Sequence, residues 1–344
     1  MPSGCERCGF RRVAPGPSFA IGVLVQPSSR AGPAAPSWRS LMRLTLAFLV
    51  AAAVLVLPPA SLAEDGTSGL TFLKLGAGAR AIGLGGAYTA VGGDASTIYW
   101  NPAGTVDVEN IDVVLMHAEW FEGIRYEYVG GVRSDGEQAF GVAMTGLYMD
   151  DLERREGPTA EPIGHFGVFD FAVTGTYGRM LTEYLDVGIG GKYLFEKIDD
   201  ETTGGLAVDL GAQYMIPGLP GLTAGAAVQN VGPRMKFIED EFDLPLTYRV
   251  GAALEAPVEA FKGELLITGD AVIPNDGDTK YHFGLEFEFM ELLALRFGYR
   301  SGWDNQNVAV GMGANVRNFR FDYAYVPFYS DLGDTHRLSL GFSL

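Results

Sequence analysis

From Ile111 to its last residue the chain divides into segments of roughly ten residues in which apolar side chains alternate with small or polar ones. Successive side chains of a β-strand point to opposite faces, so this pattern gives each segment one apolar face. The last segment shows the pattern clearly, because Leu338, Leu340, Phe342 and Leu344 fall on one face. A strand between lipid and a wet lumen has this pattern, and so does an edge strand of a soluble sheet whose apolar face is covered.

Clusters of Asp, Gly, Pro and Asn separate these segments and predict turns. The pattern predicts fourteen strands. They are Ile111–Trp120, Ile124–Arg133, Gln138–Met149, Phe166–Met180, Leu185–Phe195, Thr203–Ile216, Thr223–Val231, Leu246–Ala256, Glu264–Ile273, Lys280–Phe289, Leu292–Arg300, Asn307–Val316, Phe319–Val326 and His336–Leu344.

The connections between these strands alternate in length, as they do in an up-and-down outer-membrane barrel. Odd connections include the long ones Asp150–His165, Gly232–Pro245 and Pro327–Thr335, whereas most even ones are short, Pro257–Gly263 being the longest exception. Aromatic residues near strand ends suggest an interfacial girdle. These are Tyr126, Tyr128, Tyr193, Phe195, Tyr323 and Tyr325. The prediction is an all-β, 14-stranded antiparallel transmembrane barrel; a secreted β-sandwich or propeller is the alternative.

The N-terminal part has the features of a secretory signal peptide. Leu44 to Leu57 form a 14-residue apolar run that follows Arg43 and precedes small residues ending at Ala63. This run is too short to span a membrane as a helix, so residues 42–63 are predicted to be a signal peptide cleaved after Ala63. Residues 1–41 are predicted to be a mis-assigned or extended leader, with Met42 as the true start.

Both cysteines, Cys5 and Cys8, lie in this leader, where an isolated C-x-x-C spacing is a weak metal or redox signal. Removing residues 1–63 takes six arginines and one glutamate from 25 basic and 42 acidic residues, which leaves 19 and 41 and a net charge of −22. Nucleic acid is therefore not expected as a partner.

A Gly- and Ala-rich stretch from Leu75 to Gly104 precedes the first strand. It is not read as a phosphate loop, because no buried strand precedes it, the G-x-G-x-x-G register is not met and no lysine follows. So many small residues allow backbone to pack on backbone in a confined space, and Asn101-Pro102-Ala103-Gly104 is expected to form a tight turn into the first strand.

The block GARAIGLGGAYTAVGGDASTIYWNPAG resembles the N-terminal segment of the PorV/PorQ family, which is related to FadL-type outer-membrane proteins. The resemblance implies a hatch folded inside a 14-stranded barrel, from about Thr71 to Gly104, within a unit of residues 64–104 that starts in the periplasm. Residues 105–344 would then form the barrel. The hatch motif comprises Gly83, Gly85, Gly86, Asp94, Trp100, Asn101, Pro102 and Gly104.

The resemblance implies two functions of different classes. In the first, the protein is a PorV-like component of type IX-like secretion that holds a secretion barrel or exported cargo proteins. In the second, it is a FadL-like passive channel in which a hydrophobic small molecule displaces the hatch. A purely structural barrel is a third possibility. Each places the protein among outer-membrane lipid in a Gram-negative-type bacterium.

No pattern of residues predicts an enzyme, a cofactor or a metal site. The histidines His117, His165, His282 and His336 are isolated in the sequence. Asn275–Asp278 lacks the distal Glu of a calcium loop and is expected to be a solvated turn. The acidic runs Glu239–Glu241 and Asp199–Glu201 are expected in external loops. Charged residues that alternate with apolar ones are candidates for the lumen lining, either as satisfied networks or as ligands. They are Asp170, Asp186, Lys192, Asp209, Arg296, Arg320, Asp322 and Arg337.

Overall fold

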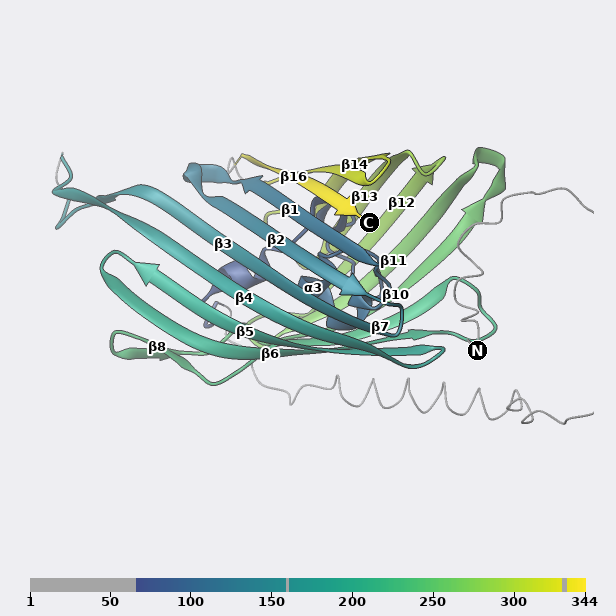
Figure 1. Ribbon diagram of the computed structural model, residues 1–344. Helices are drawn as coiled ribbons and strands as arrows, with labels where there is room; N and C mark the ends of the chain where they lie inside the picture. The colour runs from purple at the N-terminus through teal and green to yellow at the C-terminus, as the bar shows by residue number, and fades with distance from the viewer. Residues whose placement is uncertain (1–65, 159–160, 330–332) are drawn as a thin grey trace, which may run out of the picture. The chain divides into compact units, whose positions relative to one another are not determined.

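A computed structural model describes residues 66–158, 161–329 and 333–344. The signal peptide, both cysteines and the start at Met42 or Met1 lie outside this part. Fourteen strands form a closed barrel in which each strand pairs with its neighbours in the chain and β1 pairs with β16 (Figure 1). The barrel strands are β1 (Ile111–Glu119), β2 (Arg125–Ser134), β3 (Gln138–Arg154), β4 (Gly164–Thr182), β5 (Leu185–Ile198), β6 (Glu201–Met215), β7 (Leu222–Val231), β10 (Thr247–Val258), β11 (Gly263–Pro274), β12 (Lys280–Phe289), β13 (Leu293–Ser301), β14 (Val308–Val316), β15 (Phe319–Pro327) and β16 (Asp334–Ser343).

Every pair of neighbouring strands is antiparallel, and the closing pair runs from Asp112↔Ser343 to Glu119↔His336. The backbone of Leu344 continues this pair, because its N–H donates to the carbonyl of Ile111 over 2.8 Å. Closure leaves no unpaired strand edge, which satisfies the backbone polar groups that lipid could not. The predicted fourteen-stranded antiparallel barrel is therefore confirmed.

Two features of the connections differ from the prediction. Strands β3 and β4 continue past Met149 and before Phe166 into what was expected to be a loop. The predicted loop Gly232–Pro245 contains a small hairpin of β8 (Met235–Phe237) and β9 (Asp240–Phe242). Both regions are rich in charged residues, so the alternation of apolar residues did not mark them as strands.

The odd connections, from β1–β2 to β15–β16, lie at one end of the barrel, which we call the long-loop end. Ile111 and Leu344 lie at the opposite, short-turn end. The even connection that was expected to be longer than the others, Pro257–Gly263, is short in the structure. Strand β10 continues to Val258, so the connection is a single turn of 3₁₀-helix η5 (Glu259–Phe261).

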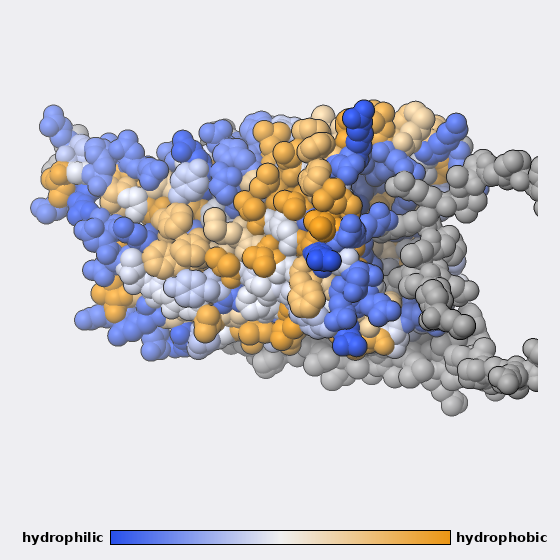
Figure 2. Space-filling view, viewed as in Figure 1, coloured by the Kyte–Doolittle hydropathy of each residue, from blue (hydrophilic) through white to orange (hydrophobic). Residues whose placement is uncertain are grey.

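Hydrophobic side chains gather over the middle of the outer surface, and hydrophilic ones over the end that carries the β3–β4 hairpin (Figure 2). Tyr193 and Tyr323 are on this outer face of their strands, whereas Tyr126 and Tyr128 are 0% and 1% exposed and point inward. Their assignment to an aromatic girdle was therefore wrong. Their strand alternates like its neighbours, but its inward face carries the aromatic rings. No helix in the described part of the chain is long and apolar enough to cross a membrane.

Candidate functional site: the hatch and the barrel wall

Residues 71–104, the hatch, run through the inside of the barrel from the long-loop end to the short-turn end (Figure 1). Four short helices shape this region. They are η2 (Thr71–Lys74), α2 (Ala79–Gly83), α3 (Thr97–Trp100) and η3 (Pro102–Thr105). The side chains of the segment are nearly all buried. The small residues predicted to allow close packing therefore lie against the inner wall.

Residues 66–69, which precede the hatch, lie at the long-loop end. Ser68 forms a bridge with Asp243, and the N–H of Gly69 donates to the carbonyl of Asp243 over 3.2 Å. Asp243 belongs to the β7–β10 connection at the long-loop end, opposite Ile111. Residues 66–69 therefore lie at the end of the barrel opposite the start of β1, and the chain crosses the length of the lumen before β1. The periplasmic start of the 64–104 unit stays a prediction.

Two glycines of the wall allow the hatch backbone to approach the strands. A Cβ atom on Gly188 of β5 would lie 2.3 Å from the carbonyl carbon of Pro102. A Cβ atom on Gly311 of β14 would lie 3.1 Å from the Cα atom of Gly83 in α2. At these points backbone packs directly on backbone, which is possible only without side chains.

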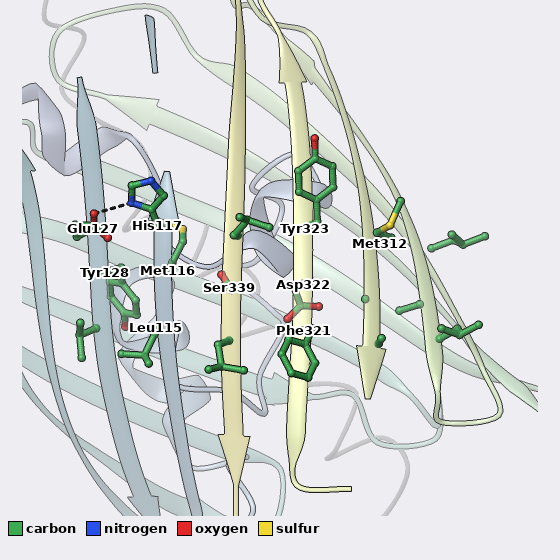
Figure 3. Close-up of a pocket in the computed structure, with 18 of the residues that line it drawn as sticks. Leu115, Met116, His117, Glu127, Tyr128, Met312, Phe321, Asp322, Tyr323 and Ser339 are labelled. Atoms are coloured by element: carbon green, nitrogen blue, oxygen red, sulfur yellow. Dashed lines mark hydrogen bonds and ion pairs between the residues drawn. The ribbon is translucent and has the colours of Figure 1, made fainter. Parts of the chain in front are cut away.

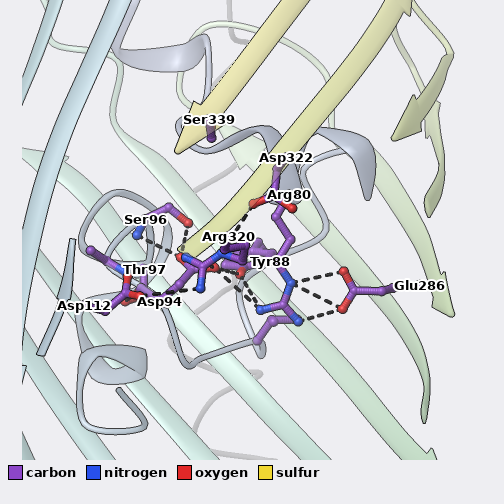
Figure 4. A network of polar contacts seen from close by, with 12 residues as sticks. Arg80, Tyr88, Asp94, Ser96, Thr97, Asp112, Glu286, Arg320, Asp322 and Ser339 are labelled. Carbon is purple, nitrogen blue, oxygen red and sulfur yellow. Dashed lines mark hydrogen bonds and ion pairs between the residues drawn. The ribbon is translucent and has the colours of Figure 1, made fainter. Parts of the chain in front are cut away.

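A chain of buried charges joins the hatch to the wall strands β12, β13 and β15 (Figure 4). The Arg80 guanidinium of α2 reaches Glu286 at 2.7 Å, and Glu286 also pairs with Arg296. Arg296 in turn lies 2.7 Å from Asp322. Arg320 extends the chain of contacts, lying 3.3 Å from Asp322. Because each buried charge has an opposite partner, the network can exist in a low-dielectric interior.

Asp94 is the hatch carboxylate of this network. It accepts a hydrogen bond from the Tyr88 hydroxyl over 2.6 Å and from the Ser96 N–H over 2.9 Å. Burial would raise the pKa of Asp94, but the guanidinium groups of Arg320 and Arg80 hold that pKa below its usual value. Asp94 therefore remains ionised and can act as an electrostatic anchor of the hatch.

A second anchor is Asp270 of β11. Its Oδ2 atom accepts hydrogen bonds from the N–H groups of Tyr88 and Thr89 over 3.0 and 3.1 Å and from the Thr89 hydroxyl over 2.6 Å. Arg249 of β10 pairs with the same oxygen at 3.0 Å and places its guanidinium 4.9 Å from the centre of the Trp100 ring. The turn of the hatch before Ala90 is thus held by one carboxylate.

The Asn-Pro-Ala turn of the motif caps η3. The Asn101 side chain accepts from the Ala103 N–H over 3.1 Å, and its Nδ2 group donates to the Thr89 carbonyl over 2.7 Å and to the Ala212 carbonyl of β6 over 3.1 Å. Asn101 thereby links three backbone segments, which explains why an amide that both donates and accepts stands here.

A clasp at the long-loop end holds the start of the hatch. Asp276, in the β11–β12 connection, pairs with Lys74 and accepts a hydrogen bond from Ser68. Asp276 is buried, so the prediction of a solvated turn was wrong for this residue, whereas Asp278 is exposed. Burial alone would raise the pKa of Asp276. The contacts with Lys74 and Ser68 lower it by more than burial raises it, so this pKa lies below its usual value.

An apolar groove of about 980 Å³ lies on the outer side of the wall formed by β12–β16, β1 and β2 (Figure 3). Outward side chains such as Leu295, Phe321 and Leu338 line it. Ser339 and Asp322 also line the groove, and both connect to the inner contacts: the Ser339 hydroxyl accepts from the Ala79 N–H over 2.9 Å, and Asp322 belongs to the charge network. A single layer of β-sheet therefore separates the groove from the hatch.

Of the predicted lumen residues, all but Arg320 are buried, and Arg320 is half-buried. Arg296, Arg320 and Asp322 meet in the hatch network, and Arg337 donates to the Leu75 carbonyl over 2.8 Å. Lys192 and Asp209 pair with each other at 2.7 Å. Asp170 and Asp186 lie on the other side of the barrel, on β4 and β5. Several charged hatch partners were missed. They are Arg80, Asp112, Arg249, Asp270, Glu286 and Arg300.

The alternation around Asp270 and Glu286 could have identified them as inward-facing. Within the described residues there is no group of three His, Cys, Asp or Glu side chains that could hold a metal ion. The acidic run at Asp240 is part of β9, and the one at Asp199 forms the β5–β6 turn; both are at the long-loop end.

This arrangement defines a class of protein, the closed 14-stranded barrel with a chain segment inside it. Solved structures share the fold. They include the CymD monoaromatic hydrocarbon channel (TM-score 0.56, 12% identity, covering 78% of this chain and 98% of that one) and the Pseudomonas putida toluene transporter TodX (0.52, 11%, 82% and 98%). A Pseudomonas aeruginosa FadL homologue is also similar (0.50, 8%, 75% and 96%).

In sequence, residues 61–185 match the model of an uncharacterised protein family, UPF0164. The match includes the hatch and the first four strands. No curated protein matches the chain.

Proposed function

We propose that this protein is an outer-membrane channel of a Gram-negative-type bacterium that passes a hydrophobic compound when the hatch moves. The observation that carries this proposal is the position of the apolar groove, which shares Ser339 with a contact that holds α2 and Asp322 with the charge network of the wall. The groove lies within the size range of small-molecule sites and is lined mainly by apolar side chains. The similar folds of the hydrocarbon channels support this function.

In the state described, the hatch fills the lumen, so passage requires its displacement. The contacts that hold it are mostly polar, whereas the residues lining the groove are mostly apolar. A solute that occupied the groove would press on the Gly-rich part of β14, against which α2 packs. Occupancy and hatch position would thereby be coupled through one strand layer.

A disulfide between hatch and wall tests this proposal, because both cysteines of the chain lie in the predicted leader and the barrel has none. The contact between Ala79 and Ser339 makes Ala79→Cys with Ser339→Cys a suitable pair. The control pair, Thr145→Cys with Ala172→Cys, joins register partners of β3 and β4 and does not tether the hatch.

The readout is uptake of a labelled aromatic hydrocarbon by intact cells that lack such channels of their own. We expect the oxidised Ala79–Ser339 pair to reduce uptake to the level of cells without the barrel, and a reductant to restore it. The control pair should take up the compound in both redox states. Equal uptake by the oxidised and reduced tethered barrel would refute the proposal.

The long β3–β4 hairpin favours a second candidate, a PorV-like component that holds secreted cargo or a secretion barrel. The two strands continue to Arg154 and from Gly164, so the hairpin extends beyond the part where β2 and β5 pair with it. If this candidate is right, a tagged barrel should recover an exported protein or a secretion barrel in stoichiometric amount. Replacing the hairpin tip with a short turn should abolish that recovery while the barrel still folds.

A further inference from the structure

Charged side chains interrupt the apolar outer face of the barrel at β2. The outward positions of this strand are Arg125, Glu127, Val129, Gly131 and Arg133. Only Val129 and Gly131 separate the charges of Glu127 and Arg133. Glu127 also contacts His117 of β1, whose Nδ1 atom lies 2.7 Å from the Glu127 carboxylate (Figure 3). The side chains of His117 and Glu127 are 48% and 36% exposed, so this pair faces the surroundings of the barrel.

The apolar band on β2 is much lower than that of an ordinary outer-membrane barrel. Glu127 and Arg133 are six residues apart. With a rise of about 3.3 Å per residue and a strand tilt of about 40°, this separation is a height of roughly 15 Å, whereas the usual apolar band is about 25 Å tall. On β1, His117 follows Ile111 by six residues, so its height above the short turns is similar. Two neighbouring strands therefore place polar groups well inside the usual band.

Strands β4 and β6 show the usual height. On β4 the outward positions from Phe169 to Tyr177 carry no charge, and Arg179 is the next outward position toward the short turns. Phe169 and Arg179 are ten residues apart, which is roughly 25 Å by the same conversion. On β6 no outward position from Thr202 to Tyr214 is charged. The apolar band is therefore about 10 Å lower at β1 and β2 than at β4 and β6.

We propose that the outer membrane is locally thinned where it meets the narrow face, which we define as the outward residues of β1 and β2. A charge on the lipid-facing side of a barrel is destabilising near the bilayer centre and tolerated near the bilayer surfaces. In a bilayer of full thickness, Glu127 and His117 would lie about 10 Å below the surface. Thinning by that amount brings polar lipid groups and water to this pair. Bilayers thin in this way beside an apolar stretch that is too short for them.

The partner that fits the narrow face is lipid rather than another protein. The outward neighbours of the pair are aliphatic, and Leu115, Val129 and Leu338 are 43%, 44% and 56% exposed. These three side chains line the apolar groove together with His117 and Glu127. Acyl chains fit such an aliphatic surface, and the edge of a thinned bilayer solvates the charges beside it. This inference does not depend on the proposed transport, because it uses only the outer face of the barrel.

Nitroxide probes on single cysteines measure the thinning. Cys5→Ser and Cys8→Ser remove the two native thiols of the chain. Leu338→Cys on β16 places a probe beside His117, its register partner. Leu210→Cys on β6 is the matched control, because both leucines are exposed and lie five residues before the short-turn end of their strand. The barrel is reconstituted in vesicles of palmitoyl-oleoyl phosphatidylcholine. Collision rates of each probe with oxygen and with a water-soluble nickel complex then give its depth in the bilayer.

The Leu210 probe should lie about 10 Å deeper than the Leu338 probe, which is the difference in height between the two bands. The double variant His117→Leu with Glu127→Leu extends the apolar run by two residues on each strand, as far as the next charged positions. It should move the Leu338 probe about 5 Å deeper and leave the Leu210 probe unchanged. Both substitutions are on the outer face, and heat-modifiable gel migration verifies that the barrel has formed.

The proposal is overturned if the two probes lie at equal depth when His117 and Glu127 are present. The exposed pair would then be assigned to a contact with another protein. It is also overturned if the double variant leaves the depth of the Leu338 probe unchanged, because these charges would then not set the local thickness of the bilayer.

Discussion

The substitution Asp270→Asn should release the middle of the hatch while leaving the barrel closed. It keeps the shape of the side chain but removes the negative charge that Arg249 and the N–H groups of Tyr88 and Thr89 share. Breaking a buried charge pair by removing one partner's charge costs about 3–5 kcal/mol. Because each 1.4 kcal/mol is a factor of ten, local opening should become about a hundred to several thousand times more frequent.

Hydrogen exchange of the backbone amides measures this opening directly. The amides of Tyr88 and Thr89 should exchange faster by the opening factor in Asp270→Asn, whereas amides in the ladder between β3 and β4 should not change. The matched control is Asp209→Asn, which also removes a buried carboxylate from an ion pair, with Lys192 at 2.7 Å, but makes no hydrogen bond to the hatch.

In the control, exchange should increase at Asn230, whose N–H donates to Asp209 over 2.8 Å, and not at Tyr88 or Thr89. The reasoning is refuted if Asp270→Asn leaves the exchange of Tyr88 and Thr89 unchanged. Equal acceleration of these amides in both variants would refute it as well, since the effect would then reflect a general loss of stability.

Three further predictions concern the packing and the charges of the hatch. Gly188→Ala should destabilise the barrel by about 1–3 kcal/mol or prevent its assembly, and lost assembly would be seen as loss of heat-modifiable gel migration. Gly191→Ala on the same strand is the control and should be tolerated, because no atom lies within 4 Å of its added Cβ. Because folding lowers the pKa of Asp94, the ionised carboxylate stabilises the hatch above the ordinary value of 3.8, and this stabilisation is lost as the pH falls through the folded-state pKa. Hydrogen exchange of the hatch amides, corrected for intrinsic rates, should therefore rise only below about pH 4. The Asp94→Asn variant should not show that rise. Lys74→Met should loosen the clasp at Asp276 by about 1 kcal/mol and speed exchange near residue 69 about fivefold, without affecting the centre of the hatch.

The barrel could be predicted from the sequence because a strand between lipid and lumen must alternate, and this requirement acts on every residue of the strand. The predicted and observed limits of β12 are identical, and those of β1 differ by one residue. Strand ends beyond the apolar part were missed for the same reason. Past Met149, the residues of β3 are mostly charged and are exposed or half-buried, so apolar side chains do not alternate there.

The hatch contacts could not be predicted, because they join residues far apart in the chain. Alternation places Asp322 and Arg296 inside the barrel, but it does not indicate which of the other inward charges lie beside them. Arg80 is in a segment without period two, and its partner Glu286 is 206 residues away. The buried position of Asp276 was missed because an exposed turn and a turn clasped by Lys74 have the same local sequence.

The most direct test of the proposed channel is purification of the wild-type protein from outer membranes in mild detergent, with bound small molecules and bound proteins both identified by mass spectrometry. We predict that hydrophobic compounds copurify with the barrel and that no protein partner is present in stoichiometric amount. Stoichiometric recovery of a large secretion barrel or of exported proteins, without bound hydrophobic compounds, would contradict the account.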